Sequence, residues 1–146
     1  MEKFRLAGEI RRLNNLIKRY IDADEIFARQ KDVTGTHGYI LGFVRRKSEE
    51  GEPVYQKNIE QAFSIRRSSA TEILNAMEQN GLLMRVEDES DKRMKKIVLT
   101  QKGMDVHTKT VERLDFLDKK LIAELSENEL EVLQSVINKL KNKLDY

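Results

Sequence analysis

Residues 63–103 read FSIRRSSATEILNAMEQNGLLMRVEDESDKRMKKIVLTQKG, and this stretch predicts the fold. Ser64 lies in a short turn. From Arg66 to Asn80 the apolar residues recur every three or four positions, which is the spacing of a helix with one buried face. Gly81 follows, and glycine most readily takes the left-handed conformation that ends many helices. We therefore predict a tight turn followed by a helix that ends at Asn80.

The second half of the stretch predicts a β-hairpin. Residues 82–87 and 95–99 carry apolar and β-branched side chains, and the polar segment between them is too long for a two-residue turn. Thr100 is placed to cap a following helix. A helix that begins with Arg66 and Arg67, with a basic ribbon beside it, predicts a winged helix-turn-helix, in which that helix enters a DNA groove.

Helices are also predicted on the N-terminal side of this unit. Apolar residues recur at helical spacing in residues 2–24, and the mixed segment 22–32 carries that helix to its end. Thr34 or Thr36 can cap the next helix, whose apolar residues lie within 39–44. The sequence therefore predicts a long helix and a shorter one ahead of the helix-turn-helix.

Shorter elements and two further helices complete the prediction. Residues 54–55 are compatible with a very short strand, and residues 56–63 with a short helix ahead of the turn. A long amphipathic helix starts at Gln101, and Ser126 with Glu129 forms a capping box that marks the start of the last helix. The fold class is therefore mainly α with a small β-hairpin wing, an α+β winged helix-turn-helix flanked by terminal helices.

Composition limits the possible classes of protein. With 146 residues, of which 39% are hydrophobic and 36% charged, the chain is one domain rich in solvated helices. The net charge of +2 is too small to indicate a nucleic-acid partner by itself, so local charge placement must do so. The chain has no cysteine, no signal-peptide pattern and no apolar run of the roughly 18 residues that span a membrane. We expect a soluble cytoplasmic protein with no membrane partner.

The terminal helices carry more apolar surface than the winged helix can cover. They could pack on each other within one chain, or interlock with the helices of a second copy. We expect the second arrangement, a homodimer, because DNA readers of this type commonly bind two-fold sites. The single domain 1–146 would then consist of a DNA-binding part, residues 33–103, and a helical dimerisation part, residues 1–32 and 104–146.

The sequence resembles the MarR family of transcription regulators over nearly its whole length. Three pieces in order are similar to the wing signature of that family: Glu78-x-x-Gly81-Leu82, Asp91-x-Arg93 and Leu99-Thr100-x-x-Gly103. Residues 67–71, Arg-Ser-Ser-Ala-Thr, are similar to its hydroxyl-rich recognition helix. The resemblance implies a homodimeric regulator, usually a repressor, that binds a pseudo-palindromic operator in double-stranded DNA.

Three positions depart from the family pattern. Ser64 and Arg66 stand where the family usually has Gly and Ser, and Tyr55 stands where it has Ser or Thr ahead of the first helix of the motif. We expect the loss of these side chains to leave the helix starts less well capped. Because Arg66 also changes what the helix can touch, no operator sequence can be carried over from the family.

The residues expected to contact DNA lie on the recognition helix and the wing: Arg66, Arg67, Ser68, Ser69, Thr71, Asn75, Lys92, Arg93 and Lys95. The arginines can bond guanine or a phosphate pair, and the hydroxyl groups can reach nearby phosphates or base edges. The resemblance implies that Arg93 enters the minor groove, and Asp91 can hold its guanidinium. The alternatives are that the helix residues are ordinary solvated side chains, and that the Asp91–Arg93 pair only shapes the turn.

The resemblance also implies a small, often aromatic or anionic, effector that binds between the dimer helices and the winged part. Tyr20, His37, Tyr39 and Arg45 are the polar and aromatic residues expected nearest that junction. Each has a structural alternative: Tyr20 as a core residue, Arg45 as a surface or interface charge, and His37 as a helix-start side chain that bonds backbone.

Catalysis is not indicated by the sequence. His37 and His107 stand far apart, and the chain has no cysteine nucleophile, glycine-rich phosphate loop, Gly-x-Ser-x-Gly or paired-histidine metal motif. We therefore predict no enzyme, no metal site and no cofactor. The remaining alternatives are a winged helix that binds protein, and a DNA-binding protein that senses no small molecule. A protein-binding wing has no need of paired arginines at the helix start or of Arg93.

Overall fold

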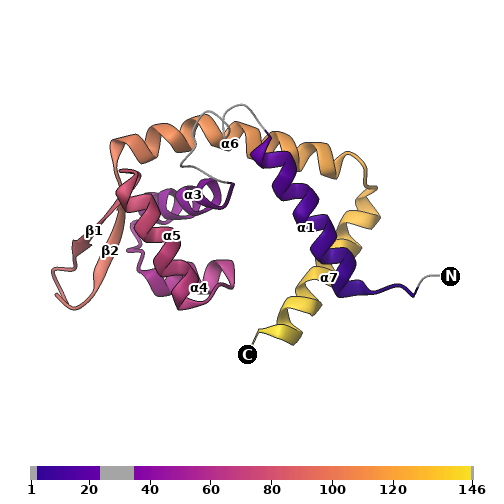
Figure 1. Ribbon diagram of the computed structural model, residues 1–146, viewed down its shortest axis with the longest axis horizontal. Helices are drawn as coiled ribbons and strands as arrows, with labels where there is room; N and C mark the ends of the chain where they lie inside the picture. The colour runs from indigo at the N-terminus through magenta and orange to yellow at the C-terminus, as the bar shows by residue number, and fades with distance from the viewer. Residues whose placement is uncertain (1–2, 24–34, 146) are drawn as a thin grey trace.

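The structure, a computed structural model, describes residues 3–23 and 35–145. Its elements in chain order are α1 Leu6–Asp22, α3 Gly35–Glu49, α4 Gln56–Phe63, α5 Arg67–Gln79, β1 Leu83–Glu87, β2 Lys95–Leu99, α6 Gln101–Ile122 and α7 Glu127–Leu144. Figure 1 shows α6 running across the molecule, from the lobe that contains α3, α4, α5 and the hairpin to the side on which α1 and α7 lie. The predicted mainly helical fold with one hairpin is confirmed.

Two expectations about the N-terminal helices have different outcomes. Thr36 lies inside α3 and so does not cap it. The continuation of the first helix through residues 24–32, and Thr34 as a cap, lie outside the described residues.

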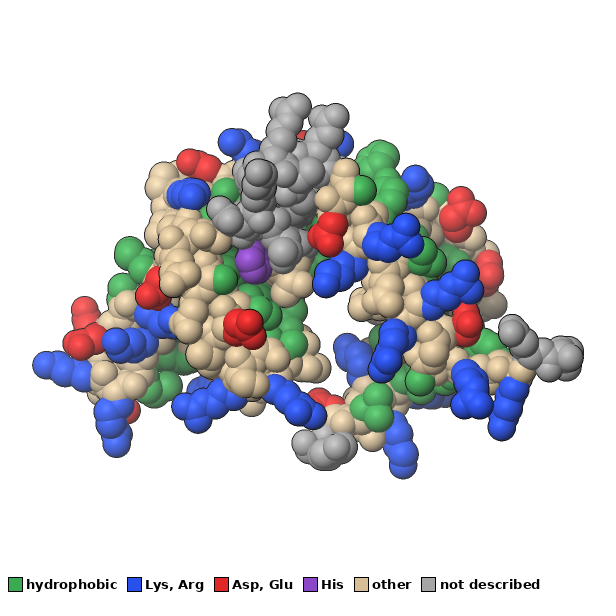
Figure 2. Space-filling model, viewed as in Figure 1, with side chains coloured by type: hydrophobic (Ala, Val, Ile, Leu, Met, Phe, Trp, Pro, Cys, Tyr) green, Lys and Arg blue, Asp and Glu red, His purple; other side chains and the backbone are tan. Residues whose placement is uncertain are grey.

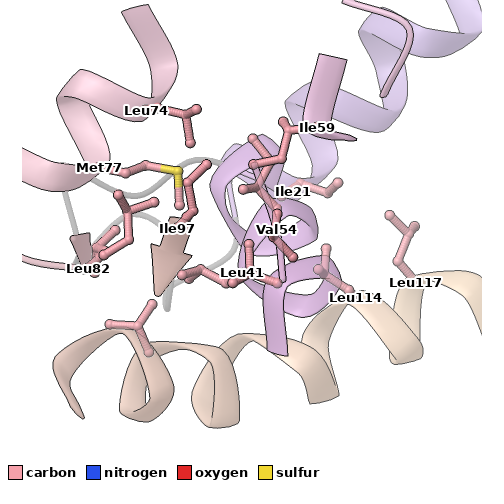
Figure 3. Close-up of a cluster of buried hydrophobic side chains, with 14 residues drawn as sticks. Ile21, Leu41, Val54, Ile59, Leu74, Met77, Leu82, Ile97, Leu114 and Leu117 are labelled. Atoms are coloured by element: carbon pink, nitrogen blue, oxygen red, sulfur yellow. The ribbon is translucent and has the colours of Figure 1, made fainter. Parts of the chain in front are cut away.

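A cluster of buried apolar side chains joins the lobe to α6 (Figure 3). The helical repeat of α3 turns Ile40, Leu41 and Val44 inward, and each is at most 1% exposed. They meet side chains from every other element of the lobe and from α6: Val54, Ile59, Leu74, Met77, Leu82, Leu83, Ile97, Val106, Leu114 and Leu117. This core fixes the recognition helix and the wing on one rigid base, because interiors of this kind are closely packed.

The hairpin is a two-stranded antiparallel sheet whose register runs from the pair Leu83–Leu99 to the pair Glu87–Lys95. Leu83 of β1 and Ile97 of β2 are buried, and their immediate neighbours in each strand are more exposed, which is the alternation expected of a sheet with one face on a core. The Val54 carbonyl accepts a hydrogen bond of 2.7 Å from the Ile97 amide. The predicted short strand at residues 54–55 is thus reduced to a single backbone hydrogen bond beside β2.

Helix ends lie close to where local sequence signals predicted them. Gly81 has a φ of 72° directly after the C-cap of α5, and Ser64 takes the same left-handed conformation, with a φ of 51°, after α4. At the start of α7, Ser126 Oγ accepts a bond from the Glu129 amide and the Glu129 carboxylate accepts one from the Ser126 amide, both at 3.1 Å. The predicted capping box is therefore confirmed.

The terminal helices keep much of their apolar surface exposed. α7 buries none of its residues, and α1 buries only Ile21. Leu13 of α1 is 55% exposed and Val132 of α7 is 53% exposed, although both belong to apolar helix faces. Packing within one chain therefore covers these two helices only in part.

Candidate nucleic-acid interface

A basic hollow lies between α4, α5 and the hairpin, with a volume of about 570 Å³. Its lining includes five basic side chains, Lys57, Arg67, Arg85, Arg93 and Lys95, and one acidic side chain, Glu60. Lysine and arginine side chains gather along the lower edge of this lobe in Figure 2. This excess of positive charge suits the phosphate backbone of DNA.

The hollow brings together residues from both predicted groups and adds residues that the sequence did not indicate. All nine predicted DNA-contacting residues are exposed. Arg67 and Thr71 of α5 line the hollow together with Arg93 and Lys95 of the wing. Lys57 and Arg85 were missed, because nothing in the local sequence places one turn of α4 and one face of β1 beside the recognition helix.

The start of α5 lacks a capping side chain. Arg66 is the N-cap residue, with extended backbone and no side-chain hydrogen bond to the first turn. The expected loss of the cap at this position is confirmed. Arg67, Ser68 and Ser69 in the first turn are exposed, so the helix presents amide groups, hydroxyl groups and arginine together. Amides at a helix start and the positive end of the helix dipole favour an anion such as phosphate here.

Gln56 is a second residue that the sequence did not indicate. Its side-chain amide donates to Thr71 Oγ1 at 2.8 Å and to the Arg67 carbonyl at 3.3 Å. The first residue of α4 is thereby tied to the exposed face of α5. Since the Thr71 hydroxyl already accepts from Gln56, the hydroxyl proton and the methyl group remain available for a base or a phosphate.

Asn75 is held by the wing. Its Oδ1 accepts a bond of 2.9 Å from Arg85 Nη1, and the same nitrogen lies 3.5 Å from Glu78 Oε2. Arg85 thus anchors β1 to the recognition helix. The Asn75 oxygen already accepts one bond within the protein, which leaves its amide nitrogen and the second lone pair of the oxygen for a contact with DNA.

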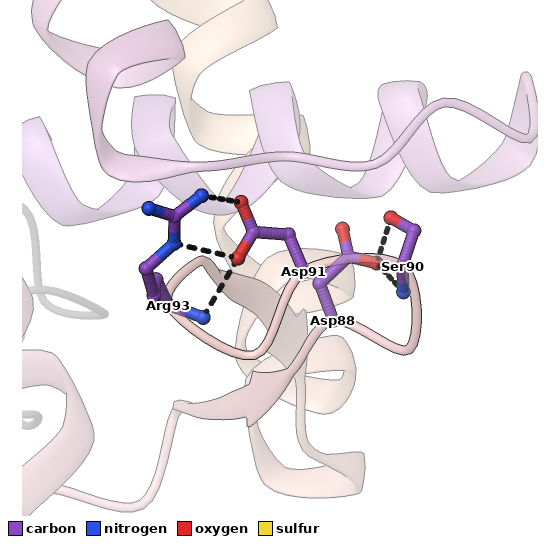
Figure 4. Close-up of polar contacts among 4 residues, drawn as sticks. All are labelled: Asp88, Ser90, Asp91 and Arg93. Carbon is purple, nitrogen blue, oxygen red and sulfur yellow. Dashed lines mark hydrogen bonds and ion pairs between the residues drawn. The ribbon is translucent and has the colours of Figure 1, made fainter.

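At the wing tip, Asp91 and Arg93 form the predicted pair (Figure 4). Arg93 Nε donates to Asp91 Oδ1 at 3.1 Å, Arg93 Nη2 donates to Oδ2 at 3.2 Å, and the Arg93 amide donates to Oδ1 at 3.0 Å. These bonds hold the pKa of Asp91 below its usual value. Because the Arg93 side chain is still 91% exposed, its guanidinium is oriented but open to a partner.

The acidic residues beside the wing do not all face solvent. Asp88 is only 7% exposed, and its carboxylate accepts hydrogen bonds from the Tyr55 hydroxyl, the Ser90 amide and the Ser90 hydroxyl. The bond from Tyr55, followed by those from Ser90, lowers the pKa of Asp88 to about 2. This carboxylate is therefore directed into the protein and away from a DNA surface.

The Tyr55 side chain does not cap the first turn of α4, so the expected loss of the cap is confirmed here too. The backbone amide of Tyr55 donates to Asn58 Oδ1 at 2.8 Å, so the Asn58 side chain satisfies this amide. The Tyr55 side chain instead reaches Asp88. The Asn58 side chain supplies only the reciprocal half of a capping box, which satisfies the Tyr55 amide and not the amides of the first turn.

Comparison with known proteins shows which family the chain is similar to. A model of the MarR family matches residues 31–94. The HTH-type transcriptional regulator PecS of Dickeya dadantii (strain 3937) is 27% identical over 99% of this chain and 84% of its own length. The crystal structure of the transcription regulator MarR from Oenococcus oeni PSU-1 is 28% identical, with a TM-score of 0.77 over 94% of this chain and 99% of that one. These comparisons confirm the resemblance to the MarR family.

The fold of this chain is also shared with a structure that contains DNA. The S. aureus MepR–DNA complex has a TM-score of 0.84 over 97% of this chain and 99% of that one, at 24% identity, which shows a shared fold. The similarity to these regulators supports a DNA-binding transcriptional regulator and not an enzyme, as predicted. Among residues 3–23 and 35–145 there is no cluster of His, Asp or Glu suited to a metal ion, and no helix long and apolar enough to cross a membrane.

Neither of two cavities beside α3, within the described residues 3–23 and 35–145, brings together the four residues predicted to bind an effector. Tyr39 lines a cavity of about 470 Å³ between α3, α4 and α6, whereas Arg45 lines another of about 670 Å³ beside β2. Tyr20 lies against Lys120, whose Nζ is 4.9 Å from the ring centre, and His37 is buried. Tyr20 and His37 line neither of these two cavities.

His107 of α6 connects the two cavities and was missed. It lines the cavity that contains Tyr39, and its Nδ1 lies 3.1 Å from Arg45 Nη1. Burial, and then the charge of Arg45, lower the pKa of His107. Burial, and then the charge of Asp118, raise the pKa of Tyr39. A lone histidine in a long helix gave no sequence signal for this role.

Proposed function

We propose that this chain represses transcription in the cytoplasm as a homodimer on a pseudo-palindromic operator and is released by a small ligand. The observation that carries the proposal is the basic hollow between the recognition helix and the wing, with the guanidinium of Arg93 held in the open by Asp91. Phosphates would lie against the basic side chains, and Arg66 and Arg67 would reach base edges.

The exposed apolar faces of α1 and α7 support the homodimer. Leu16 of α1 is 50% exposed and Ile137 of α7 is 45% exposed, and leaving such faces in water is unfavourable. A second copy can cover them, and the resulting two-fold axis would present two copies of α5 to successive turns of the major groove. Half-sites should therefore be about one helical turn apart.

The cavity between α3, α4 and α6 supports release by a ligand. Phe43 and Phe63 form an apolar wall, with their ring centres 5.8 Å apart, and Arg46 and His107 provide polar groups. An aromatic ring suits this lining, whereas Asp115 and Asp118 also line the cavity and offset the charge of Arg46, so the lining does not select for an anionic group. Because the cavity touches both the first helix of the DNA-binding motif and α6, a bound molecule can change the angle between DNA-binding and terminal parts.

Selection of bound duplexes from a random DNA pool tests the proposal, at about 150 mM salt so that non-specific phosphate binding is suppressed. We expect enrichment of a palindrome with half-sites about one helical turn apart. Arg67→Ala should alter the recovered half-site, whereas Glu112→Ala, an exposed change on α6, should not. Absence of any enriched sequence, from a chain that is dimeric in solution, would favour a winged helix that binds protein instead.

A further inference from the structure

A hydrogen bond from the Tyr55 side chain joins the wing to the start of the first helix of the DNA-binding motif. Tyr55 is the N-cap residue of α4, and its hydroxyl donates to Oδ2 of Asp88, which directly follows β1. The other carboxylate oxygen of Asp88 accepts from both the amide and the hydroxyl of Ser90, at 2.9 and 2.7 Å. Each oxygen of this buried carboxylate therefore holds a different part of the protein.

The loop that carries Arg93 is built outward from Asp88. The Asp88 amide donates to the Met94 carbonyl, and the Met94 amide donates to the Asp91 carbonyl, both at 3.0 Å. Asp91 in turn holds the guanidinium of Arg93 (Figure 4). A continuous series of hydrogen bonds thus runs from the start of α4 through Asp88 to the wing tip.

Two other attachments of the hairpin lie nearer its base. Arg85 bonds to Asn75 of α5, and the Ile97 amide bonds to the Val54 carbonyl. Arg85 and Ile97 are cross-strand partners, and the hairpin continues beyond them to the pair Glu87–Lys95 and the loop. Among the described residues, the Tyr55–Asp88 bond is the hydrogen bond between the helix-turn-helix and the wing that lies closest to the tip.

We propose that Tyr55 is a positioning residue for DNA binding, which fixes the wing tip relative to the recognition helix by holding Asp88. The core and the bonds of Arg85 and Ile97 hold the base of the hairpin, so without the Tyr55–Asp88 bond the loop beyond them would sample more orientations. Binding DNA would then require the tip to be ordered at a cost in affinity, which a preorganised tip avoids. The inference rests on the proposed function, because it concerns the same DNA surface.

The ionisation of the two groups is compatible with a permanent attachment. The hydroxyl bond from Tyr55 is the largest cause of the low pKa of Asp88, about 2, and the same bond raises the pKa of Tyr55. The acceptor therefore stays charged and the donor stays protonated across the physiological pH range. We expect the attachment to be insensitive to pH there.

The test is Tyr55→Phe, which removes only the hydroxyl group. We expect about tenfold weaker binding to a duplex recovered by selection, because a free tip must be ordered when DNA binds. Arg93→Ala should also cost less affinity when it is combined with Tyr55→Phe than in the parent, since Tyr55 acts through the tip. Equal affinity of Tyr55→Phe and parent, or an Arg93→Ala effect that is the same in both backgrounds, would overturn the proposal.

A matched pair of variants separates position from charge. Asp88→Ala and Glu89→Ala each remove one negative charge from neighbouring wing residues, but only Asp88 holds Tyr55. If charge alone mattered, both would tighten binding to DNA by a similar factor. We expect Asp88→Ala to weaken binding and Glu89→Ala to leave it equal or tighter. A common tightening would refute the positioning role.

A measurement without DNA separates this inference from the proposed function. The chain has no cysteine, so spin labels can be placed at Lys92→Cys on the wing and Glu72→Cys on α5. Labelled chain diluted in unlabelled chain reports distances within one protomer. We expect a narrow distribution that broadens with Tyr55→Phe, and identical distributions would overturn the attachment. If the parent selects no DNA while the distribution still broadens, the proposed function fails and the attachment stands.

Discussion

Gly103, in the first turn of α6, packs directly against the backbone that enters the hairpin. A Cβ atom at this position would lie 1.9 Å from the carbonyl oxygen of Leu82 and 3.0 Å from its carbonyl carbon. The same Leu82 carbonyl accepts a hydrogen bond of 3.1 Å from the Thr100 amide, while the Thr100 hydroxyl caps α6 by accepting from the Gly103 amide. Gly103→Ala must therefore displace backbone at the junction of α5, the hairpin and α6.

The expected cost follows from three contributions. Forcing a methyl group into a packed site costs about 1–3 kcal/mol, and losing the Leu82–Thr100 hydrogen bond costs about 1 kcal/mol more. Alanine regains about 1 kcal/mol over glycine inside a helix. We expect Gly103→Ala to lower the free energy of unfolding by about 1–3 kcal/mol, a large part of the roughly 5–15 kcal/mol typical of a domain.

Urea unfolding followed by circular dichroism measures this change, at one fixed protein concentration because association would shift the midpoint. Gly8→Ala is the matched control. A Cβ at Gly8 would lie 3.8 Å from Arg5 Cβ, which is an ordinary contact, so helix propensity alone should make this variant equally or slightly more stable. Equal stability of Gly103→Ala and Gly8→Ala would refute the reasoning from packing.

Three further predictions concern DNA, assembly and pH. Arg93→Ala should weaken operator binding by about 1–3 kcal/mol, and unchanged affinity at moderate salt would remove the wing from the interface. Deleting residues 1–20 should give a monomer by light scattering, and a truncated dimer would contradict the role of α1. Folding lowers the pKa of His107 from 6.5, so between the two pKa values the unfolded chain binds more protons than the folded chain. The free energy of unfolding that His107 contributes should therefore be fully present above about pH 6.5 and be lost as the pH falls through the lower pKa of the folded state. His107→Gln should flatten that fall in urea unfolding measured across pH, and identical pH profiles would contradict it.

Local signals predicted most of the fold. Gly81, Thr100 and the Ser126–Glu129 box all lie where the sequence placed helix ends, because capping depends on residues a few positions apart. The observed hairpin strands begin and end within one residue of the predicted ones, because each strand is marked by its own apolar and β-branched residues. The Asp91–Arg93 contact was also predicted, since the two residues are close in sequence.

Contacts between elements could not be predicted in the same way. The bonds from Gln56 to Thr71 and from Arg85 to Asn75 join residues on different elements, and no local pattern shows which faces meet. The effector residues illustrate the same limit. Tyr39 and Arg45 lie on one helix yet line different cavities, because six positions along a helix do not return to the same face.

Tyr55 shows why a departure from a family pattern is hard to interpret from sequence alone. A serine or threonine at this position would use its hydroxyl on the first turn of the helix, so its replacement suggests a lost cap. Here the cap is lost, because the Tyr55 side chain makes no hydrogen bond to the first turn of α4. The tyrosine hydroxyl, carried farther from the backbone by its ring, instead reaches a carboxylate on the wing, while Asn58 still accepts from the Tyr55 amide. A departure at a cap can therefore exchange a bond within one helix for a bond between two elements, and it is a loss of local capping without being a loss of tertiary contacts.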